Sequence, residues 1–385
     1  MDNKYYLHIF IIIPFLFNIS YQIQKYSKGY NNLYNFIISN GGYINPKLTP
    51  NEKSITNRYI ITSQKISKNE KILFIPDKVL LSRIHKLIFT KCLEAYGPEE
   101  ENDFDCLVYF MTIDKYNTSS FFKPYYDYLP EINESDFIRD FSNEEIDLYK
   151  GIGITKGIQN YNRFYQKAFV PVEKKLKIFS EKNNIKYENI INNFKNNFDL
   201  VATRNFGRPG SYYDHSTMVP FLDLINHSDK NNTYWFYEDL DKGYTLIAGR
   251  DIEQNEEITD SYGQYHNSYL YTTYGFVIPG NIYHEYVNVD IKGENYILHE
   301  EYLNSNINSM FEKLLNKDKY NLKEAKQCII SYLNKKLEYY IDTKKKCNRY
   351  NIKIIIDEHI HIINRTIKKV EEYNKIYINF SNIIL

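Results

Sequence analysis

Two short polar blocks in the middle of the chain constrain its fold more than any other feature. The first is the Asn-His-Ser sequence at 226–228, and the second runs from 261 to 276. Between them, residues 233–237 and 244–248 alternate as strands do, and the Asp-Lys-Gly sequence at 241–243 suits a hairpin turn. We therefore predict that sheet, and not helix, joins the two blocks.

The composition indicates a folded protein without a dominant charge. Its 385 residues are 43% hydrophobic and 16% aromatic, which is enough for a sizeable core and for two domains. Lys and Arg together number 48, as do Asp and Glu, so no overall basic field draws the protein to nucleic acid or to an anionic membrane. We expect no nucleic-acid partner, and a histone-tail substrate gains no support.

The spacing of the cysteines argues against a metal site or a disulfide framework. The cysteines are Cys92, Cys106, Cys328 and Cys347. They show no CxxC or CxC spacing, and no cluster of histidines is near them in the sequence. We expect reduced thiols and no bound metal.

The first 20 residues differ in character from the rest. Lys4 precedes an apolar run from Leu7 to Phe17, which Pro14 interrupts. This run is too short to span a bilayer comfortably, but it matches the core of a signal peptide or a short anchor. We expect residues 1–20 to direct the protein to the secretory route or an organelle reached from it, with membrane contact only through this segment if it stays uncleaved. The alternative is a buried segment in a cytoplasmic protein.

The pattern before and within the long central stretch predicts a short helix, a hairpin and then helices. Residues 35–38 indicate a helix that the Asn-Gly-Gly sequence at 40–42 ends, while 58–63 and 72–76 have the pattern of a hairpin. From about 85 to 197 the apolar spacing is helical.

Beyond about Gly280 the sheet-like pattern stops. Apolar residues then recur at helical spacing, as at Leu303, Ile307, Met310 and Leu314. This predicts a separate helical domain.

The two polar blocks, in this order, resemble the two signature segments of SET-domain methyltransferases. Segments 122–130 and 141–145 are similar to the helical insert of the branch that contains the Rubisco large-subunit lysine methyltransferase and the actin-histidine methyltransferase. The resemblance implies an α+β fold, with a SET-domain β-sheet fold over 33–280 and its helical insert at about 85–197. An all-α C-terminal domain at 285–385, which helps to bind a protein substrate, follows.

The resemblance also implies that S-adenosylmethionine is the cofactor. Its carboxylate needs a donor and its ammonium needs acceptors, and Arg204 and Asn226 suit these roles. The family places the backbone of His227 at the adenine edge and Phe276 in the same pocket. The structural alternatives are a solvated Arg204 and a buried Asn226-His227 pair that only supports the fold.

On the substrate side, the resemblance centres on Tyr262. Methyl transfer needs a neutral, aligned amine, and an aromatic channel both desolvates and aligns it. The family gives Tyr262 the catalytic role of orienting the amine, and it places five residues at the substrate, namely Phe206, Arg208, Asp223, Tyr234 and Tyr274. Because the chain has 39 tyrosines, packing alone is the alternative for each tyrosine.

The first strand departs from the family pattern. Asn57 and Tyr59 stand where the family carries a Gly-x-Gly sequence, and a Cβ there narrows the cofactor pocket. This departure motivates one alternative, a catalytically weak pseudoenzyme that binds proteins.

Two apolar positions favour lysine over histidine as the target. The histidine-modifying branch carries Asn and Trp where this chain has Phe206 and Leu222, so the second nitrogen of an imidazole would lack a partner here, at a cost of about 1–3 kcal/mol. We predict transfer of methyl groups to a lysine of a protein, non-histone rather than histone, by a monomer. Protein-histidine N-methylation stays an alternative.

Overall fold

The protein is described here by a computed structural model, which covers residues 27–53, 58–97, 102–130, 138–207 and 216–374. Three features of the sequence analysis lie outside these residues: the targeting segment at 1–20, Asn57 and Arg208.

The chain forms two compact units. The first consists of residues up to 135 together with 165–263, and the second consists of 136–164 together with 264 onward. The division thus falls at Gly263, before the domain end expected at 280, and it assigns part of the predicted insert to the second unit.

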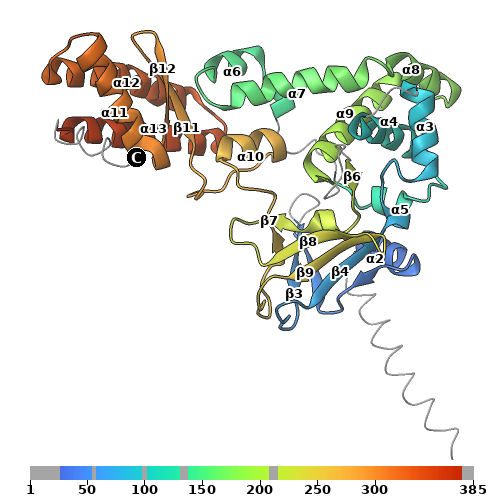
Figure 1. Ribbon diagram of the computed structural model, residues 1–385. Helices are drawn as coiled ribbons and strands as arrows, with labels where there is room; N and C mark the ends of the chain where they lie inside the picture. The colour runs from blue at the N-terminus through green and yellow to red at the C-terminus, as the bar shows by residue number, and fades with distance from the viewer. Residues whose placement is uncertain (1–26, 54–57, 98–101, 131–137, 208–215, 375–385) are drawn as a thin grey trace, which may run out of the picture. The chain divides into compact units, whose positions relative to one another are not determined.

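A four-stranded antiparallel sheet is the largest sheet of the first unit (Figure 1). Its strand order is β1 (Tyr43–Ile44), β4 (Lys71–Pro76), β9 (Gly243–Ala248) and β8 (Thr233–Glu238). Strands β8 and β9 pair from Thr233 opposite Ala248 to Glu238 opposite Gly243. This register confirms the predicted hairpin and the prediction that sheet joins the two polar blocks.

The predicted pairing of 58–63 with 72–76 is wrong, although both strands form. β3 (Arg58–Thr62) pairs with β2 (Leu48–Glu52), while β4 lies between β1 and β9. A buried strand needs a partner on each edge to satisfy its backbone. β4 takes the interior position because its side chains are fully buried at Ile72, Leu73 and Ile75.

Helices form much of the remaining first unit, as the helical spacing from about 85 to 197 predicts. They are α2 (Lys28–Ser39), α3 (Lys86–Tyr96), α4 (Asp103–Asp114), α5 (Lys123–Tyr126), α8 (Glu173–Lys182) and α9 (Tyr187–Arg204), with the 3-10 helices η1 (Asp77–Val79) and η4 (Leu222–Leu224). The helix expected at 35–38 is the last part of α2. Its end at Asn40, followed by Gly41 at φ 92°, confirms the predicted stop.

Two short strand pairs complete the first unit. β5 (Asn205–Phe206) pairs antiparallel with β6 (Thr217–Met218), and β7 (Asn226–His227) pairs parallel with β10 (Thr259–Asp260). Both pairs contain residues that the sequence analysis assigned to the site.

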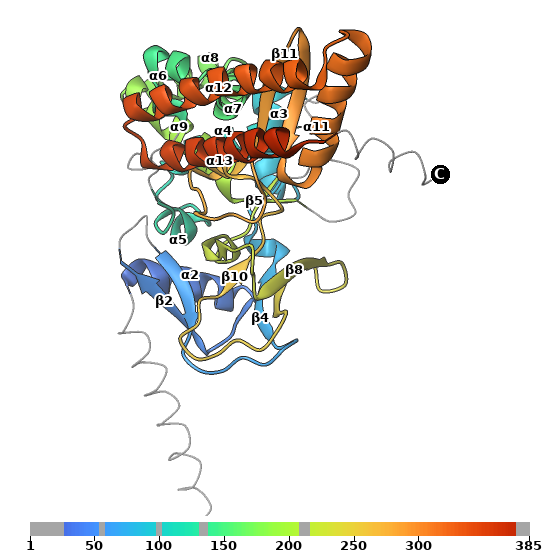
Figure 2. The ribbon, with the colours of Figure 1, turned by 90° about the vertical axis from the view of Figure 1, so that its left-hand side faces the viewer.

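The second unit is mainly helical. Its elements are η3 (Ile138–Asp140), α6 (Asn143–Leu148), α10 (Asn267–Tyr274), η5 (Glu300–Tyr302), α11 (Leu303–Glu312), the π-helix η6 (Lys313–Lys317), α12 (Leu322–Lys346) and α13 (Tyr350–Glu372), and α7 (Ile154–Phe169) begins in it. Helices α12 and α13 lie side by side (Figure 2). The helical character of the C-terminal region is thereby confirmed.

A hairpin corrects the prediction of an all-α domain over 285–385. β11 (Tyr286–Ile291) pairs antiparallel with β12 (Glu294–His299), and α11, α12 and α13 pack against this pair. Val287, Val289 and Ile291 are buried, while the residues between them are exposed. This alternation has the period of a strand, and it lies in the stretch where the sheet-like pattern was expected to have stopped.

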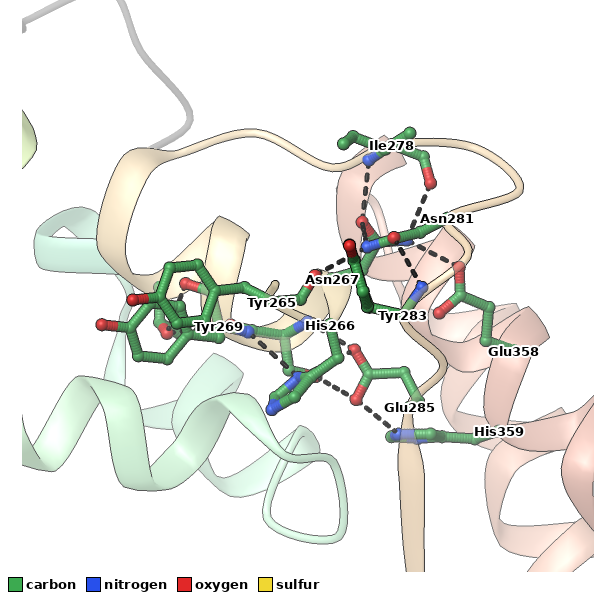
Figure 3. Close-up of polar contacts among 12 residues, drawn as sticks. Tyr265, His266, Asn267, Tyr269, Ile278, Asn281, Tyr283, Glu285, Glu358 and His359 are labelled. Carbon is green, nitrogen blue, oxygen red and sulfur yellow. Dashed lines mark hydrogen bonds and ion pairs between the residues drawn. The ribbon is translucent and has the colours of Figure 1, made fainter. Parts of the chain in front are cut away.

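A buried polar cluster holds the first turn of α10 in the second unit (Figure 3). The backbone N–H and the hydroxyl of Ser268 both donate to the carboxylate of Glu285, the hydroxyl at 2.9 Å. The same carboxylate lies 3.4 Å from His266 Nδ1 and 3.5 Å from His359 Nε2. Because His359 belongs to α13, these buried contacts connect α10 to α13.

Within the described ranges, no helix has the length and apolar character needed to cross a membrane. The cysteines are free thiols, and the part of the chain that the structure describes has no group of three or more His, Cys, Asp or Glu that could hold a metal ion.

Candidate active site

The first polar block lies beside the start of the second in the first unit, because β7 pairs parallel with β10, the strand directly before the second block. Asn226 lies opposite Thr259, and His227 lies opposite Asp260. The backbone N–H of Ser228 extends the contact by donating to the carbonyl of Asp260 at 2.9 Å. Since β8 and β9 lie between these strands in the sequence, the pairing brings together segments that are distant along the chain.

Tyr262 is held against the first block by both its main chain and its side chain. Its N–H donates to His227 Nδ1 at 3.0 Å, and its hydroxyl donates to the carbonyl of Ile225 at 2.9 Å. Burial, opposed by the charge of Arg204, raises the pKa of Tyr262 to about 12. The hydroxyl therefore stays protonated at neutral pH, and its oxygen can accept a hydrogen bond from an amine while donating to Ile225.

The imidazole of His227 takes part in the fold. Burial lowers the pKa of His227, so the neutral ring presents Nδ1 as the acceptor for the Tyr262 N–H. The two rings also lie 5.2 Å apart between centroids. These contacts give the imidazole a structural role.

Arg204 and Asp223 form a charged pair beside this junction. Arg204 is the last residue of α9, and its Nη1 donates to the backbone carbonyl of Asp223 at 2.7 Å and lies 3.6 Å from Asp223 Oδ2. The Asp223 side chain is fully buried, whereas 24% of the Arg204 side chain is exposed. Burial raises the pKa of the Asp223 carboxyl, and the charge of Arg204 is the largest opposing effect. The guanidinium is thus held by a buried partner, while the Arg204 side chain stays partly exposed.

Asn226 lies at the more open side of the same junction. Its Nδ2 donates to Glu257 Oε1 at 2.9 Å and to the carbonyl of Arg58 in β3 at 3.4 Å. Glu257 lies in no recognisable sequence motif and was not predicted as a site residue. Its carboxylate adds an acceptor beside the Asn226 amide.

An aromatic cluster surrounds Phe206. The ring of Phe206 lies 5.4 Å from Trp235 and 6.2 Å from Tyr244, measured between centroids. Trp235 also forms a side-chain hydrogen bond with Asp260. Trp235 is the single tryptophan of the sequence, and it was not predicted as a site residue.

Tyr234, which was predicted to lie at the substrate, is on the other face of β8 from this cluster. Successive side chains of a strand point to opposite faces, so Tyr234 points away from the face that carries Trp235. It is 45% exposed and lies against the backbone of Gly249 instead. Trp235, and not Tyr234, lies beside Phe206.

Two predicted site residues belong to the second unit. Tyr274 ends α10, and its ring lies 6.1 Å from that of Phe276. Between them, Gly275 has the left-handed φ of 81°, a conformation that favours glycine at the end of a helix.

Tyr59, which was predicted to match a glycine of the family pattern, lies in β3 opposite Asn51. The ammonium of Lys53 lies 5.5 Å from the centroid of its ring. The Tyr59 ring therefore lies near a lysine directly after β2.

The chain belongs to the SET domain family, whose model matches residues 57–263. The matched range ends directly after Tyr262 and contains both strands of the β7–β10 pair.

Curated relatives match it over part of their length. The N-lysine methyltransferase setd6 of Xenopus tropicalis is 23% identical over 259 residues, which cover 61% of this chain and 54% of that protein. The ribosomal lysine N-methyltransferase 4 of Schizosaccharomyces pombe is 34% identical over 70 residues, or 18% of this chain and 15% of that protein. The chain thus spans about half the length of the first of these relatives.

Solved structures match nearly the whole chain. The SET domain of LSMT bound to lysine and AdoHcy has a TM-score of 0.62 at 14% identity, covering 90% of this chain and 92% of that one. Rubisco LSMT bound to sinefungin and monomethyllysine has a TM-score of 0.62 at 14% identity, covering 94% and 98%. These likenesses confirm the predicted α+β SET-domain fold.

Proposed function

We propose that the protein is an S-adenosylmethionine-dependent protein-lysine N-methyltransferase. The single observation that carries the proposal is the β7–β10 pairing, which sets the Tyr262 hydroxyl against the carbonyl of Ile225. The names of the matched relatives, two N-lysine methyltransferases among them, support the same class of reaction.

The residues at the junction fit the charged end of S-adenosylmethionine. The partly exposed Arg204 side chain offers a fixed guanidinium for a carboxylate, and Glu257 beside Asn226 offers an acceptor for an ammonium. The fully buried Asp223 Oδ1 has no hydrogen-bond partner among the described residues, which leaves a further acceptor in this region. When bound, the cofactor supplies an electrophilic methyl group on its sulfonium.

The chain's own contribution to the reaction is the handling of the target amine. A lysine has a pKa of about 10.4, so holding its amine neutral near pH 7.4 costs roughly 4 kcal/mol. Burial in an aromatic channel reduces that cost by disfavouring the ammonium. Tyr262, which is itself neutral, accepts a hydrogen bond from the amine and directs the nitrogen lone pair toward the methyl group.

The apolar character of Phe206 and Leu222 supports lysine as the target. Phe206 packs against Trp235, and Leu222 is buried. Neither side chain offers a hydrogen bond to the second nitrogen of an imidazole, whereas a lysine's aliphatic stem needs none.

We expect the purified protein, incubated with S-adenosylmethionine and lysate proteins, to place methyl groups on lysine. Mass spectrometry of the digested products identifies the modified residue, and the Tyr262→Phe protein supplies the background. Methyl groups on histidine with none on lysine would contradict the assignment and favour the histidine-modifying alternative.

Arg204→Ala and Asn226→Ala are each expected to weaken cofactor binding about ten- to a hundredfold, because a hydrogen bond to a charged group is worth about 1.5–3 kcal/mol. Calorimetric titration measures the Kd. Arg250→Ala is the matched control, since Arg250 pairs with Glu256 at the surface of the same unit. Unchanged affinity in both site variants, with the fold intact by circular dichroism, would falsify the pocket assignment.

A protein-binding pseudoenzyme is the second candidate, favoured by Tyr59 at a position where the family carries glycine. Titration of the wild-type protein separates the two, because a pseudoenzyme with a narrowed pocket gives no binding of S-adenosylmethionine. In either case the proposed partner is a protein, and the helical second unit is the proposed region that binds it.

The location is a separate proposal. From the apolar run Leu7 to Phe17, we propose that the protein enters the secretory route or an organelle reached from it. A full-length fluorescent fusion that keeps its N-terminal residues and stays diffuse in the cytosol would contradict it.

A further inference from the structure

The segment around α5 places three tyrosine hydroxyls on three carboxylates of the first unit. Tyr125 donates to Asp223 at 2.8 Å, Tyr126 donates to Asp114 at 3.1 Å, and Tyr128 donates to Glu52 at 2.8 Å. Of these, only the Tyr125 bond reaches the candidate active site.

The burial of Tyr125 indicates that its hydroxyl has a specific role. The side chain is fully buried, and burying a hydroxyl is unfavourable unless it is hydrogen-bonded. A phenylalanine would fill the same space without that requirement. The hydroxyl bonds to Oδ2 of Asp223, the oxygen that also lies 3.6 Å from Arg204 Nη1.

We propose that Tyr125 is a positioning residue, which fixes the Asp223 carboxylate and, through it, the Arg204 guanidinium for the charged amino-acid end of the bound cofactor. The inference rests on the proposed function for the identity of that ligand. With Oδ2 held by Tyr125 and Arg204, the carboxylate cannot rotate freely. The guanidinium is held in turn, because it bonds to the carbonyl of the same residue.

Burial raises the pKa of the Asp223 carboxyl, and four charged or polar groups also act on it. Arg204 on α9, Arg58 on β3 and the Tyr125 hydroxyl on α5 favour the carboxylate, while Tyr262 interacts with it electrostatically. Since the Tyr125 hydrogen bond lowers the pKa of Asp223, removing it raises that pKa further. If a ligand binds only when Asp223 is a carboxylate, its affinity is then lost at a higher pH than in the wild type as the solution is acidified.

The test compares Tyr125→Phe with Tyr126→Phe. Both tyrosines are buried on the same short helix and donate to a buried aspartate, so the two changes remove the same group at a similar structural cost. We expect Tyr125→Phe alone to weaken S-adenosylmethionine binding about tenfold and to move the acid limb of the binding profile upward. Carbon-13 NMR of labelled aspartate carboxyls, assigned with Asp223→Asn, should show the higher pKa of Asp223 in the same variant.

Equal binding profiles and an equal pKa of Asp223 in the two variants would overturn the inference. If Tyr125→Phe fails to fold, 3,5-difluorotyrosine at position 125 keeps the hydroxyl and makes it a stronger donor, so the pKa of Asp223 should then fall, and an unchanged value would overturn the inference. Wild-type protein that does not bind S-adenosylmethionine would contradict the proposed function instead, and the carboxyl titration would still decide whether Tyr125 holds Asp223.

Discussion

Replacing Tyr262 by phenylalanine is expected to remove most methyl transfer and to leave cofactor binding nearly unchanged. The change deletes the only atom of this side chain that can accept a hydrogen bond from the amine, and loss of alignment costs on the order of a hundredfold in rate. The main-chain hydrogen bond from residue 262 to His227 Nδ1 does not depend on the hydroxyl. A kcat measured with saturating substrate, together with a calorimetric Kd, separates the two effects.

Tyr96→Phe is the matched control for this experiment. Its hydroxyl, in the first unit, also donates to backbone carbonyls, those of Asp105 at 3.1 Å and Ala168 at 3.0 Å. Loss of activity in both variants would show that removing a buried tyrosine hydroxyl lowers activity by disturbing the fold, and not by a direct effect on the amine. Full activity of Tyr262→Phe would remove Tyr262 from the mechanism.

Glu285→Ala is expected to destabilise the protein by about 3–5 kcal/mol, because it leaves the buried Ser268 and His359 and the half-buried His266 without their carboxylate partner (Figure 3). Burial alone would raise the pKa of Glu285, but hydrogen bonds and charge interactions with His266 and His359 outweigh it and lower the pKa to about 2. The stabilisation is therefore complete above the ordinary value of 4.5 and is lost as the pH falls toward 2.

Denaturant unfolding of both proteins between pH 7 and pH 3 measures this difference. The gap between wild type and Glu285→Ala should have its full size just above pH 4.5 and should shrink as the pH falls below that value. Asp342→Ala is the control, since its ion pair with Lys346 on α12 is largely exposed and is worth at most about 1 kcal/mol. A gap no larger than that of the control would show that Glu285 does not anchor α10.

Local patterns in the sequence predict several features of the molecule correctly. The β8–β9 hairpin follows from alternation around a turn, and the end of α2 at Asn40 follows from the Asn-Gly-Gly sequence at 40–42. The residues of the Asn-His-Ser block and Tyr262 indicate the SET family, because they recur in a set order. Each of these features depends on residues that are close together in the chain.

Other features depend on which distant segments meet, and the residue pattern alone did not reveal them. Alternation shows that Tyr234 and Trp235 lie on opposite faces, but only the packed sheet shows that Trp235 is on the face of Phe206. The same pattern in β3 and β4 identified two strands but not their partners, since pairing follows from how each strand satisfies its backbone when buried.

The order of residue types along the chain was thus sufficient to predict the family and the β8–β9 hairpin. The bond from Tyr125 to Asp223 was not, because it joins residues far apart in the sequence and no spacing rule connects them. Burial decided it: a carboxylate and a hydroxyl removed from water must find each other, and only the folded chain determines which ones do.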